Sequence, residues 1–357
     1  MKVGILTGGG DCPGLNAVIR AIVRKGEQTY GDELLGFRHG WRGMLDRETL
    51  PLNRETTRGL LHRGGTILQS SRTNPYKTEG GVEAVKATFA ALELDALIAI
   101  GGEDTLGVAK KLNDDGLPVI GVPKTIDNDL SGTEYTFGFH TAVQIASEAI
   151  DRLHTTAESH DRTMVVEVMG RHAGWIALYS GLAASADMIL IPEHPFDINE
   201  IVSRLRQRHE RTNFSVIVVA EGATPKEGTM STTSGEVDAF GHVQLGGIAN
   251  ILGAELRERT GHDVRVTILG HLLRGGTPTA YDRILATRFG VGAIDAVHDG
   301  AFGTMVALQA DKIVRVPLEV AVGTLKVVDD EIFSVAEVFF GQEWHGKERR
   351  SIPRDNS

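Results

Sequence analysis

The feature that most constrains this chain is a repeated unit: a short apolar run, then a glycine-rich or charged stretch, then an amphipathic helical pattern. Continuous apolar runs predict buried strands, and a 3.6-residue periodicity predicts helices. The expected strands cover residues 3–6, 94–100, 117–122, 163–168, 187–191, 214–220 and 263–269. Strands that alternate with helices favour parallel sheets with helices on both faces. The predicted fold class is therefore α/β.

The segments between these strands fit that class. The expected helices begin near Leu15, Leu106, His140, Ala173, 197, 246 and 279. Residues 304–318 alternate about Ala310 and Asp311 and predict a hairpin. Residues 222–243 are rich in polar side chains and predict a long mobile loop, and residues 341–357 predict a flexible charged tail.

Charge and cysteine content exclude several classes of protein. The net charge is −10, from 37 Lys and Arg against 47 Asp and Glu, so a nucleic-acid partner is not expected and any basic site must be local. Cys12 is the single cysteine, which excludes an internal disulfide and fits a reducing compartment. No apolar run reaches the ~18–20 residues of a membrane span, and the first residues lack a signal-peptide layout. We expect a cytoplasmic protein without a membrane partner.

The first glycine loop is TGGG at residues 7–10, followed by Asp11 and by Pro13 as an expected first-turn residue of the next helix. Strand, glycines and helix together present backbone N–H groups at a helix N-terminus, where anions bind. The pattern is neither Walker A nor GxGxxG. On these residues alone, a tight turn without a ligand explains the loop equally well.

A second loop of the same layout is GGEDT at residues 101–105. Its two carboxylates, Glu103 and Asp104, stand at the start of the expected helix. Helix capping and the helix dipole explain one of them. The second is explained by metal ligation close to bound phosphates.

The stretch GVPKTIDND at residues 121–129 combines Lys124 with Asp127 and Asp129 directly after an apolar run. Paired carboxylates beside a cation suit a site where a base accepts a proton and a phosphate is neutralised. A solvated acidic turn is the alternative, because Asp and Asn both favour turns. Arg72, in the polar loop at residues 62–76, is either a surface arginine or part of the same site.

Polar clusters also follow the later expected strands, at residues 169–171, 221 and 271–274. In parallel sheets, ligands bind beyond the carboxyl ends of the strands. One charged strand end carries little weight, but six of them together indicate a single binding site.

The motifs TGGGDCPGLNAVIR, GGEDT, PKTIDND, VEVMGRHAG and GHLLRGGTPTAYDR, in this order and spacing, resemble the phosphofructokinase family from about residue 1 to residue 320. The resemblance implies two Rossmann-like parallel-sheet domains with the active site in the cleft between them. Residues 1–138 with about 274–325 would form the phosphoryl-donor domain, and residues 139–273 the fructose 6-phosphate domain.

In this family a sugar hydroxyl attacks a terminal phosphoryl group in the presence of a divalent metal. The resemblance implies that Asp127 is the base for the 1-hydroxyl of fructose 6-phosphate. It also implies that Glu103 binds Mg²⁺ and that Arg72 stabilises the phosphoryl group in transfer. Further positions matching the family are Gly10 and Gly102 for the donor, and Thr125, Asp129, Arg162, Met169, Gly170, Arg171, Glu221, Arg265, His271 and Arg274 for the sugar phosphate.

Two implications concern assembly and regulation. In the family, positions like Arg162 and Arg265 reach into the neighbouring subunit's site, so a homodimer or homotetramer is implied. Members that use pyrophosphate typically lack allosteric control, so a non-allosteric enzyme is implied.

Asp104 and Lys124 bear on the phosphoryl donor. The ATP-using branch has Gly at both positions, and this chain resembles the pyrophosphate-using branch, in its actinobacterial-type mixed-substrate group. A carboxylate ~4 Å from a nucleotide α-phosphate would cost about 4 kcal/mol at an effective dielectric of ~20. Lys124 would supply positive charge to pyrophosphate. The expected reaction is reversible and gives fructose 1,6-bisphosphate and phosphate.

Four alternatives stay open at this stage. The first two are an ATP-dependent enzyme that tolerates Asp104 and a variant that prefers sedoheptulose 7-phosphate. A related kinase of lipids or NAD is disfavoured by PKTIDND and MGRHAG. A non-catalytic sensor is disfavoured by the presence of both Asp127 and Glu103.

Overall fold

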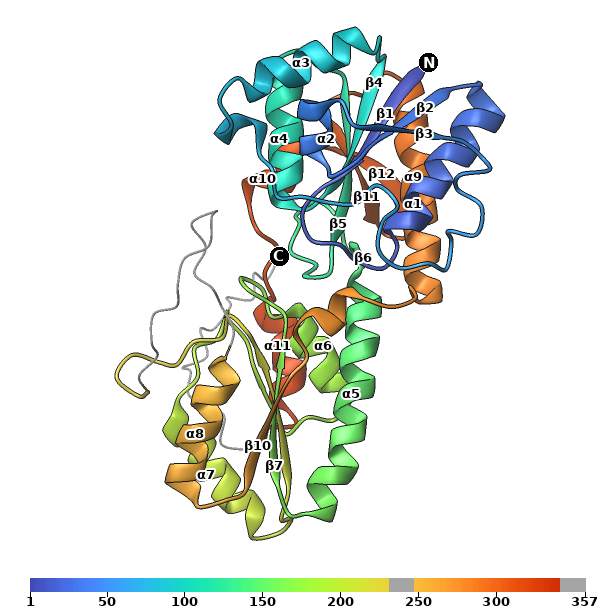
Figure 1. Cartoon of the computed structure of the whole chain (residues 1–357). Coiled ribbons are helices and arrows are strands. Elements are labelled where there is room, and N and C mark those ends of the chain that lie inside the picture. The colour runs from blue at the N-terminus through green and yellow to red at the C-terminus, as the bar shows by residue number, and fades with distance from the viewer. Residues whose placement is uncertain (231–246, 341–357) are drawn as a thin grey trace, which may run out of the picture.

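The computed structural model describes residues 1–230 and 247–340 as two lobes, each built on one sheet (Figure 1). The first sheet has eight strands in the order β12-β11-β5-β4-β1-β2-β3, with β6 paired to β5. Its strands are β1 (Lys2–Thr7), β2 (Glu33–Phe37), β3 (Thr49–Leu52), β4 (Ala96–Gly101), β5 (Val119–Thr125), β6 (Phe137–Gly138), β11 (Thr304–Gln309) and β12 (Lys312–Pro317). Only the pairings of β3 and β12 are antiparallel, so the interior of this sheet is parallel.

The second sheet has four strands in the order β10-β7-β9-β8, all parallel. They are β7 (Thr163–Val168), β8 (Met188–Leu190), β9 (Ser215–Ala220) and β10 (Val264–Ile268). Figure 1 shows the two sheets end to end, with the carboxyl ends of β5 and β7 directed toward the boundary between the lobes. The predicted ligand-binding ends of both sheets therefore face one another.

Helices cover both faces of each sheet, as predicted. On the first sheet, α1 (Leu15–Lys25) and α9 (Ala280–His298) cover one face, and α2 (Trp41–Asp46), α3 (Gly81–Ala91), α4 (Glu103–Asp114) and α10 (Leu318–Gly323) the other. On the second, α5 (Phe139–Ser159), α6 (Trp175–Ala183) and α11 (Asp330–Glu337) cover one face, and α7 (Ile198–His209) and α8 (Ile248–Thr260) the other. Short helices run over η1 (Gly26–Tyr30), η2 (Pro75–Lys77) and η3 (Gly270–Arg274).

Strand β4 illustrates why helices cover both faces of the first sheet. Its side chains alternate between the two faces, so that Ile98 packs in the core with α1 and α9 while Leu97 packs in the core with α4. Every residue of β4 is buried. Burying one such side chain stabilises the fold by about 1.5–3 kcal/mol, so a continuous apolar strand requires helices on both sides.

The predicted hairpin is confirmed, because Ala310 and Asp311 both have positive φ between β11 and β12.

Two expected element boundaries were wrong. Helix α1 begins at Leu15 after Gly14, whose φ is 112°, so Pro13 precedes the helix. Strand β5 runs through Thr125, because β6 pairs with its last two residues. Lys124 is therefore part of a strand and not of a loop.

The edge elements were not predicted. Strands β2 and β3, helices α2 and α3, and the carboxyl-terminal α10 and α11 lack the long periodic patterns that single out the other elements. Of the expected mobile loop at 222–243, residues 231–243 lie outside the described residues, as does the expected flexible tail at 341–357.

Candidate active site

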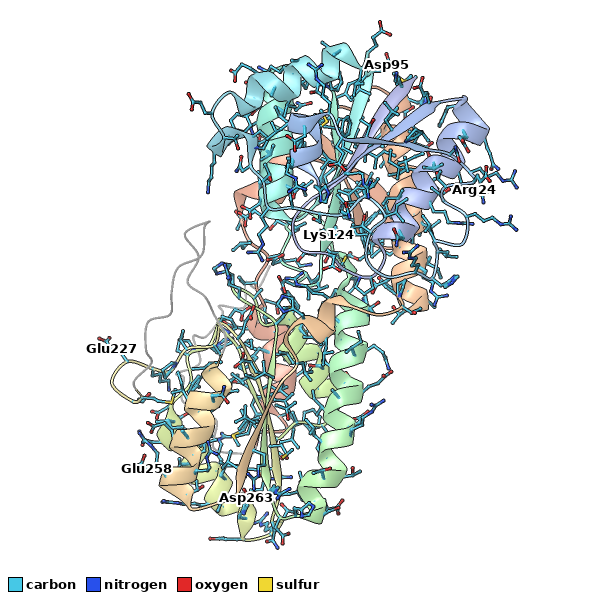
Figure 2. All side chains as sticks on the ribbon, viewed as in Figure 1. Arg24, Asp95, Lys124, Glu227, Glu258 and Asp263 are labelled. Carbon is cyan, nitrogen blue, oxygen red and sulfur yellow. The ribbon has the colours of Figure 1, made fainter. Side chains whose placement is uncertain are left out.

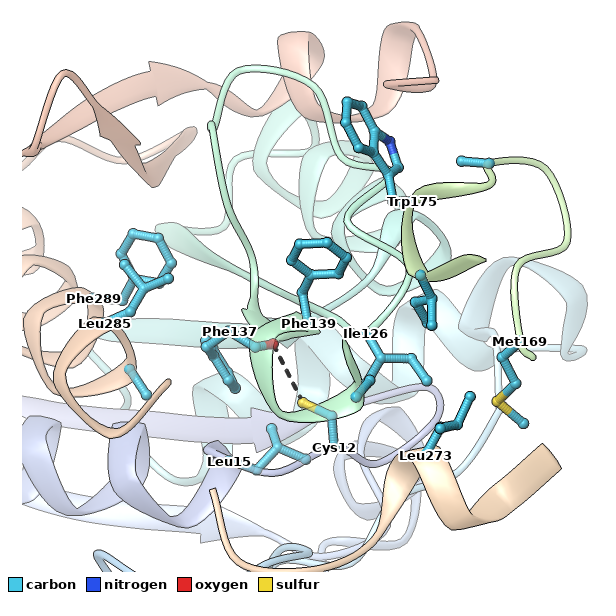
Figure 3. Close-up of a cluster of buried hydrophobic side chains, with 14 of the residues drawn as sticks. Cys12, Leu15, Ile126, Phe137, Phe139, Met169, Trp175, Leu273, Leu285 and Phe289 are labelled. Atoms are coloured by element: carbon cyan, nitrogen blue, oxygen red, sulfur yellow. Dashed lines mark hydrogen bonds between the residues drawn. The ribbon is translucent and has the colours of Figure 1, made fainter. Parts of the chain in front are cut away.

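The candidate site is built from loops at the carboxyl ends of β1, β4 and β5 in the first lobe and of β7, β9 and β10 in the second. Lys124, at the end of β5, lies at the boundary between the lobes (Figure 2). An apolar cluster joins the two halves beneath the site. Figure 3 shows Cys12 and Ile126 of the first lobe close to Met169 and Leu273 of the second.

The glycine loop after β1 is held by backbone hydrogen bonds to its neighbours. The N–H of Gly8 donates to the carbonyl of Ile100 at 2.9 Å, and the N–H of Gly9 donates to the carbonyl of Ser71 at 3.1 Å. A Cβ atom on Gly8 would lie 2.5 Å from Thr105 Oγ1, so only glycine fits there. The bond to Ser71 brings the adjacent Arg72, which is exposed, next to this loop.

Lys124 is buried, with only 3% of its surface exposed. Its ammonium donates to the carbonyl of Gly10 at 2.5 Å, and burial lowers its pKa. This burial disfavours the alternative in which the stretch at residues 121–129 is only a solvated turn. Lys124 instead supports the glycine loop from below, within reach of the charge of Asp127.

Three carboxylates gather on the first-lobe side. Burial raises the pKa of Asp127, and the pKa of Asp129 is raised to about 7, first by burial and then by the charges of Asp127 and Glu103. The N–H of Asp127 donates to Thr125 Oγ1 at 3.0 Å, which fixes the turn after β5. The acids predicted to work together are thus close enough to influence one another.

Glu103 and Asp104 are the first two residues of α4, and both are exposed. Among the described residues no group of three or more His, Cys, Asp or Glu is arranged to hold a metal ion. Mg²⁺ at phosphate sites usually takes one or two carboxylates, substrate phosphates and water. Glu103 beside Asp129 therefore fits a magnesium ion that arrives with its phosphate.

The second lobe supplies cations to the same place. Arg274, in η3, donates to the carbonyl of Asp11 at 3.4 Å, and a Cβ on Gly10 would lie 2.5 Å from its guanidinium. The positive charges of Arg274, Lys124 and Arg171 oppose the burial that raises the pKa of Asp127. The loop that carries Asp127 therefore lies among positive charges from its own lobe, from the second lobe and from η3.

The turn after β7 carries Met169, Gly170 and Arg171. Met169 is buried, and Gly170 adopts a φ of 147° that side chains rarely allow. The N–H of Glu221, after β9, donates to the carbonyl of Val168 at 2.9 Å and brings Glu221 beside this turn. Burial raises the pKa of Glu221, and the charge of Asp127 raises it further.

Arg162 and Arg265 are not brought to this site. Arg162 precedes β7 and Arg265 is the second residue of β10, so both lie at the amino end of the sheet. Both bind Asp263, at 2.7 and 3.1 Å. Figure 2 shows Asp263 at the end of the second lobe remote from Lys124. A six-residue strand spans about 20 Å, which separates these arginines from Asp127 of their own chain.

The structure places two unpredicted residues at the site. His172, whose charge would lower the pKa of Asp127, directly follows Arg171 in a motif that the sequence singled out. Lys326 donates to Asn128 Oδ1 at 3.0 Å, between the two aspartates, and its N–H donates to the carbonyl of Asp129. No local signal marks Lys326, because it comes almost two hundred residues later in the chain.

A separate surface groove of about 400 Å³ lies between α9 and the β11–β12 hairpin. Its lining includes Arg288, Asp295 and Arg315 and none of the residues named above, so it is distinct from the candidate site.

No helix in the described part of the chain has the length and apolar character to cross a membrane.

Comparisons with known proteins agree with this geometry. A family model described as "Phosphofructokinase" matches residues 2–297. A pyrophosphate–fructose 6-phosphate 1-phosphotransferase of Amycolatopsis methanolica is 64% identical over 96% of this chain and 100% of its own length. An ATP-dependent 6-phosphofructokinase of Corynebacterium efficiens is 54% identical over 96% of this chain and 99% of its own length.

Among solved structures, the T-state phosphofructokinase of Pichia pastoris superposes with a TM-score of 0.80 at 32% identity. That match covers 95% of this chain and 36% of the longer fungal chain. Fold, motif positions and sequence identity lead to one conclusion: this chain belongs to the phosphofructokinase family.

Proposed function

We propose that this protein transfers a phosphoryl group from pyrophosphate to the 1-hydroxyl of D-fructose 6-phosphate, giving fructose 1,6-bisphosphate and phosphate. The observation that carries the proposal is the position of Asp127. It stands where the two lobes meet, between the glycine loop and Lys124 on one side and Arg171 and Arg274 on the other. The relative from Amycolatopsis methanolica carries the name of this activity.

The two lobes divide the substrates in this proposal. The first lobe, which we assign to residues 1–138 and about 274–325, binds the phosphoryl donor through Gly10, Gly102 and Lys124. The second lobe, residues 139–273, binds the sugar phosphate. Its contacts are Met169, Gly170, Arg171, Glu221 and His271 together with Arg274 of the adjoining η3, and the β5 loop adds Thr125 and Asp129. A bidentate guanidinium suits the sugar phosphate.

In the forward reaction, Asp127 accepts the proton of the 1-hydroxyl while that oxygen attacks the terminal phosphorus in line. The bond from this phosphorus to the bridging oxygen breaks, and orthophosphate leaves. In the reverse direction the protonated Asp127 returns its proton to the sugar oxygen. The raised pKa of Asp127 suits both roles, because a base whose pKa approaches the working pH gives and takes protons efficiently.

Arg72 lies beside Gly9 and would neutralise charge on the phosphoryl group as it moves. Glu103 would hold Mg²⁺ against the pyrophosphate oxygens. The ion, when bound, neutralises phosphate charge and holds the two phosphates in one orientation. Without it, the carboxylates near Glu103 would repel pyrophosphate, so Glu103→Gln should raise the Mg²⁺ requirement about tenfold or more, a change of ~1.4 kcal/mol in binding.

Asp104 favours pyrophosphate as the donor through the charge of its carboxylate, whereas Lys124 acts by holding the glycine loop at Gly10. Asp104 is exposed at the first turn of α4, so water screens its repulsion of a nucleotide phosphate. At ~4 Å this repulsion is about 1 kcal/mol in water and about 4 kcal/mol at an effective dielectric of ~20. ATP is therefore the second candidate donor, and the 54% identical relative with an ATP-dependent name favours testing it.

We further propose a homodimer or homotetramer in which Arg162 and Arg265 bind the sugar phosphate of the neighbouring subunit. Their distance from Asp127 within one chain supports this arrangement. Mixing Asp127→Asn subunits with Arg162→Ala subunits should then restore activity, since mixed oligomers contain some intact sites. Activity no higher than that of the two variants alone would argue against shared sites. A cytoplasmic, non-allosteric enzyme remains part of the proposal.

The deciding experiment measures fructose 1,6-bisphosphate formation from fructose 6-phosphate and Mg²⁺, with pyrophosphate or ATP as the separate donor. Turnover with pyrophosphate is expected. Turnover with ATP alone would keep Asp127 as the base and overturn the donor assignment. Replacing fructose 6-phosphate by sedoheptulose 7-phosphate, which has the same reacting hydroxyl, measures the preference for the acceptor.

A further inference from the structure

Residues 324–328, here termed the crossing segment, connect α10 on the first lobe to α11 on the second (Figure 1). The crossing segment runs along the loop that carries Asp127 and Asp129. Ser131 Oγ donates to the carbonyl of Thr324 at 2.6 Å, and Leu130 and Leu325 form an antiparallel bridge. The N–H of Lys326 then donates to the carbonyl of Asp129 at 2.9 Å.

The ammonium of Lys326 makes three further hydrogen bonds, all to this loop. It donates to Asn128 Oδ1 at 3.0 Å, to the carbonyl of Thr133 at 3.1 Å and to the carbonyl of Glu134 at 2.7 Å. An ammonium has three N–H donors, so its capacity is used completely. Asn128 stands between the two aspartates with a φ of 53°, and its Oδ1 also accepts from the N–H of Thr136. Lys326 therefore binds the loop at Asn128, the residue with positive φ between the two aspartates.

The main chain of Lys326 reaches the second lobe. Trp175 Nε1 donates to the carbonyl of Lys326 at 2.9 Å, and the Trp175 ring centre lies 5.4 Å from the ammonium. Trp175 is the first residue of α6, just after the turn with Met169, Gly170 and Arg171. The N–H of Val328 donates to Glu193 Oε1, which also accepts from the N–H of Gly174. One residue thus links the acidic loop of one lobe to the sugar-binding turn of the other.

We propose that Lys326 is a positioning residue for phosphoryl transfer, which fixes the Asp127–Asp129 loop and couples it to the start of α6. The inference rests on the proposed function, since it assigns Lys326 to the reaction of that site. Small displacements matter in such a site, because a shift of about 1 Å in a reacting group can cost a hundredfold in rate. The hydrogen bonds of Lys326 described above join the loop around the base to Trp175, so Lys326 should affect the chemical step more than donor binding.

The test is Lys326→Met, which keeps an unbranched apolar stem and removes the charge and all three donors. We expect kcat to fall about a hundredfold, with the KM for pyrophosphate changed less than threefold. Lys326→Arg, which retains a cationic donor, should recover part of kcat.

Lys25→Met is the matched control. Lys25 is also half-buried, with its ammonium 2.8 Å from Asp295 and 5.9 Å from the ring centre of Tyr30, and it lies on α1 outside the site. We expect Lys25→Met to lower the melting temperature and to leave kcat unchanged. Lys326→Met enzyme with kcat within twofold of wild type, at a similar loss of melting temperature, would overturn the inference.

Should Lys326→Met fail to fold, Asn128→Gly gives the same test. Glycine accepts the positive φ of Asn128, so this variant removes the buried side chain, including the amide oxygen that Lys326 and Thr136 share, without straining the turn. A fall in kcat without a comparable change in the KM for pyrophosphate supports the inference, and full kcat overturns it. Wild-type enzyme is assayed in parallel. If wild-type enzyme shows no turnover with either donor, the proposed function is wrong. If wild-type enzyme turns over and the variants keep full kcat, only the Lys326 assignment is wrong.

Discussion

The two edges that meet at the candidate site differ in charge. The first-lobe edge carries Glu103, Asp127 and Asp129. Burial raises the pKa values of both aspartates, and the charge of Asp127 raises that of Asp129 further. The second-lobe side supplies Arg171 and Arg274, whose charges oppose that rise at Asp127. The proposed base lies on one edge, and the arginines proposed to bind the sugar phosphate lie on the other. The comparison teaches that the protonation of Asp127 depends on how closely the two lobes approach.

Asp127→Asn should have the largest effect, because it removes the acid that the second-lobe cations surround. We expect kcat to fall about a thousandfold, within the range for loss of a general base. The melting temperature should stay equal or rise, since a half-buried charge is removed. Steady-state kinetics and thermal melts measure the two effects. A tenfold loss or less would mean that another group accepts the proton.

Arg274→Met removes the cation that bridges the two edges. The pKa of Asp127 should rise when this charge is lost, so that a larger share of Asp127 is protonated and inactive at low pH. We expect kcat/KM for fructose 6-phosphate to fall at all pH values, and about tenfold more at pH 6 than at pH 8. A pH–rate profile checks this. A loss that is equal at all pH values would show that Arg274 only binds phosphate.

Asp129→Asn tests the first-lobe edge by itself. The pKa of Asp129 is about 7 in the folded chain and 3.8 as a free side chain, so the folded state binds this proton more tightly. Stability present below pH ~4 is therefore lost as the pH rises toward 7. Asn avoids this loss, and we expect it to stabilise the magnesium-free protein by about 1–3 kcal/mol at pH 8 and by less at pH 5. Denaturant unfolding at both pH values measures the difference, and an equal effect would contradict it.

Asp104→Gly should have the smallest effect, because the carboxylate is exposed and screened. We expect kcat/KM for ATP to rise less than tenfold, with pyrophosphate still used. Lys124→Gly, by contrast, should impair both donors, since it removes the buried support of Gly10. Competition between the donors in one assay gives the ratio. A hundredfold rise in kcat/KM for ATP in Asp104→Gly would instead support the repulsion of about 4 kcal/mol between Asp104 and a nucleotide phosphate that the sequence suggested.

Much of this site could be predicted because it consists of local motifs. The loops containing Gly10, Glu103, Asp127 and Arg171 each follow an apolar strand, and the parallel sheet brings such strand ends to one edge. Strands β2 and β3 escaped prediction because they are short. Strand β3 forms the edge of the sheet and is mostly half-buried, so burial imposes little pattern on its sequence, and β2 is buried but has only five residues.

By itself, the sequence determined the α/β class, the order of the strand–loop–helix units and the family, since these depend on periodicity and on contiguous motifs. Only the tertiary structure decided that Lys124 is buried under the glycine loop, that Arg162 and Arg265 lie far from Asp127, and that Lys326 binds the turn between Asp127 and Asp129. The physical reason is that burial, charge and hydrogen bonding depend on distance in space. Residues far apart in the chain acquire those relations only when the chain folds.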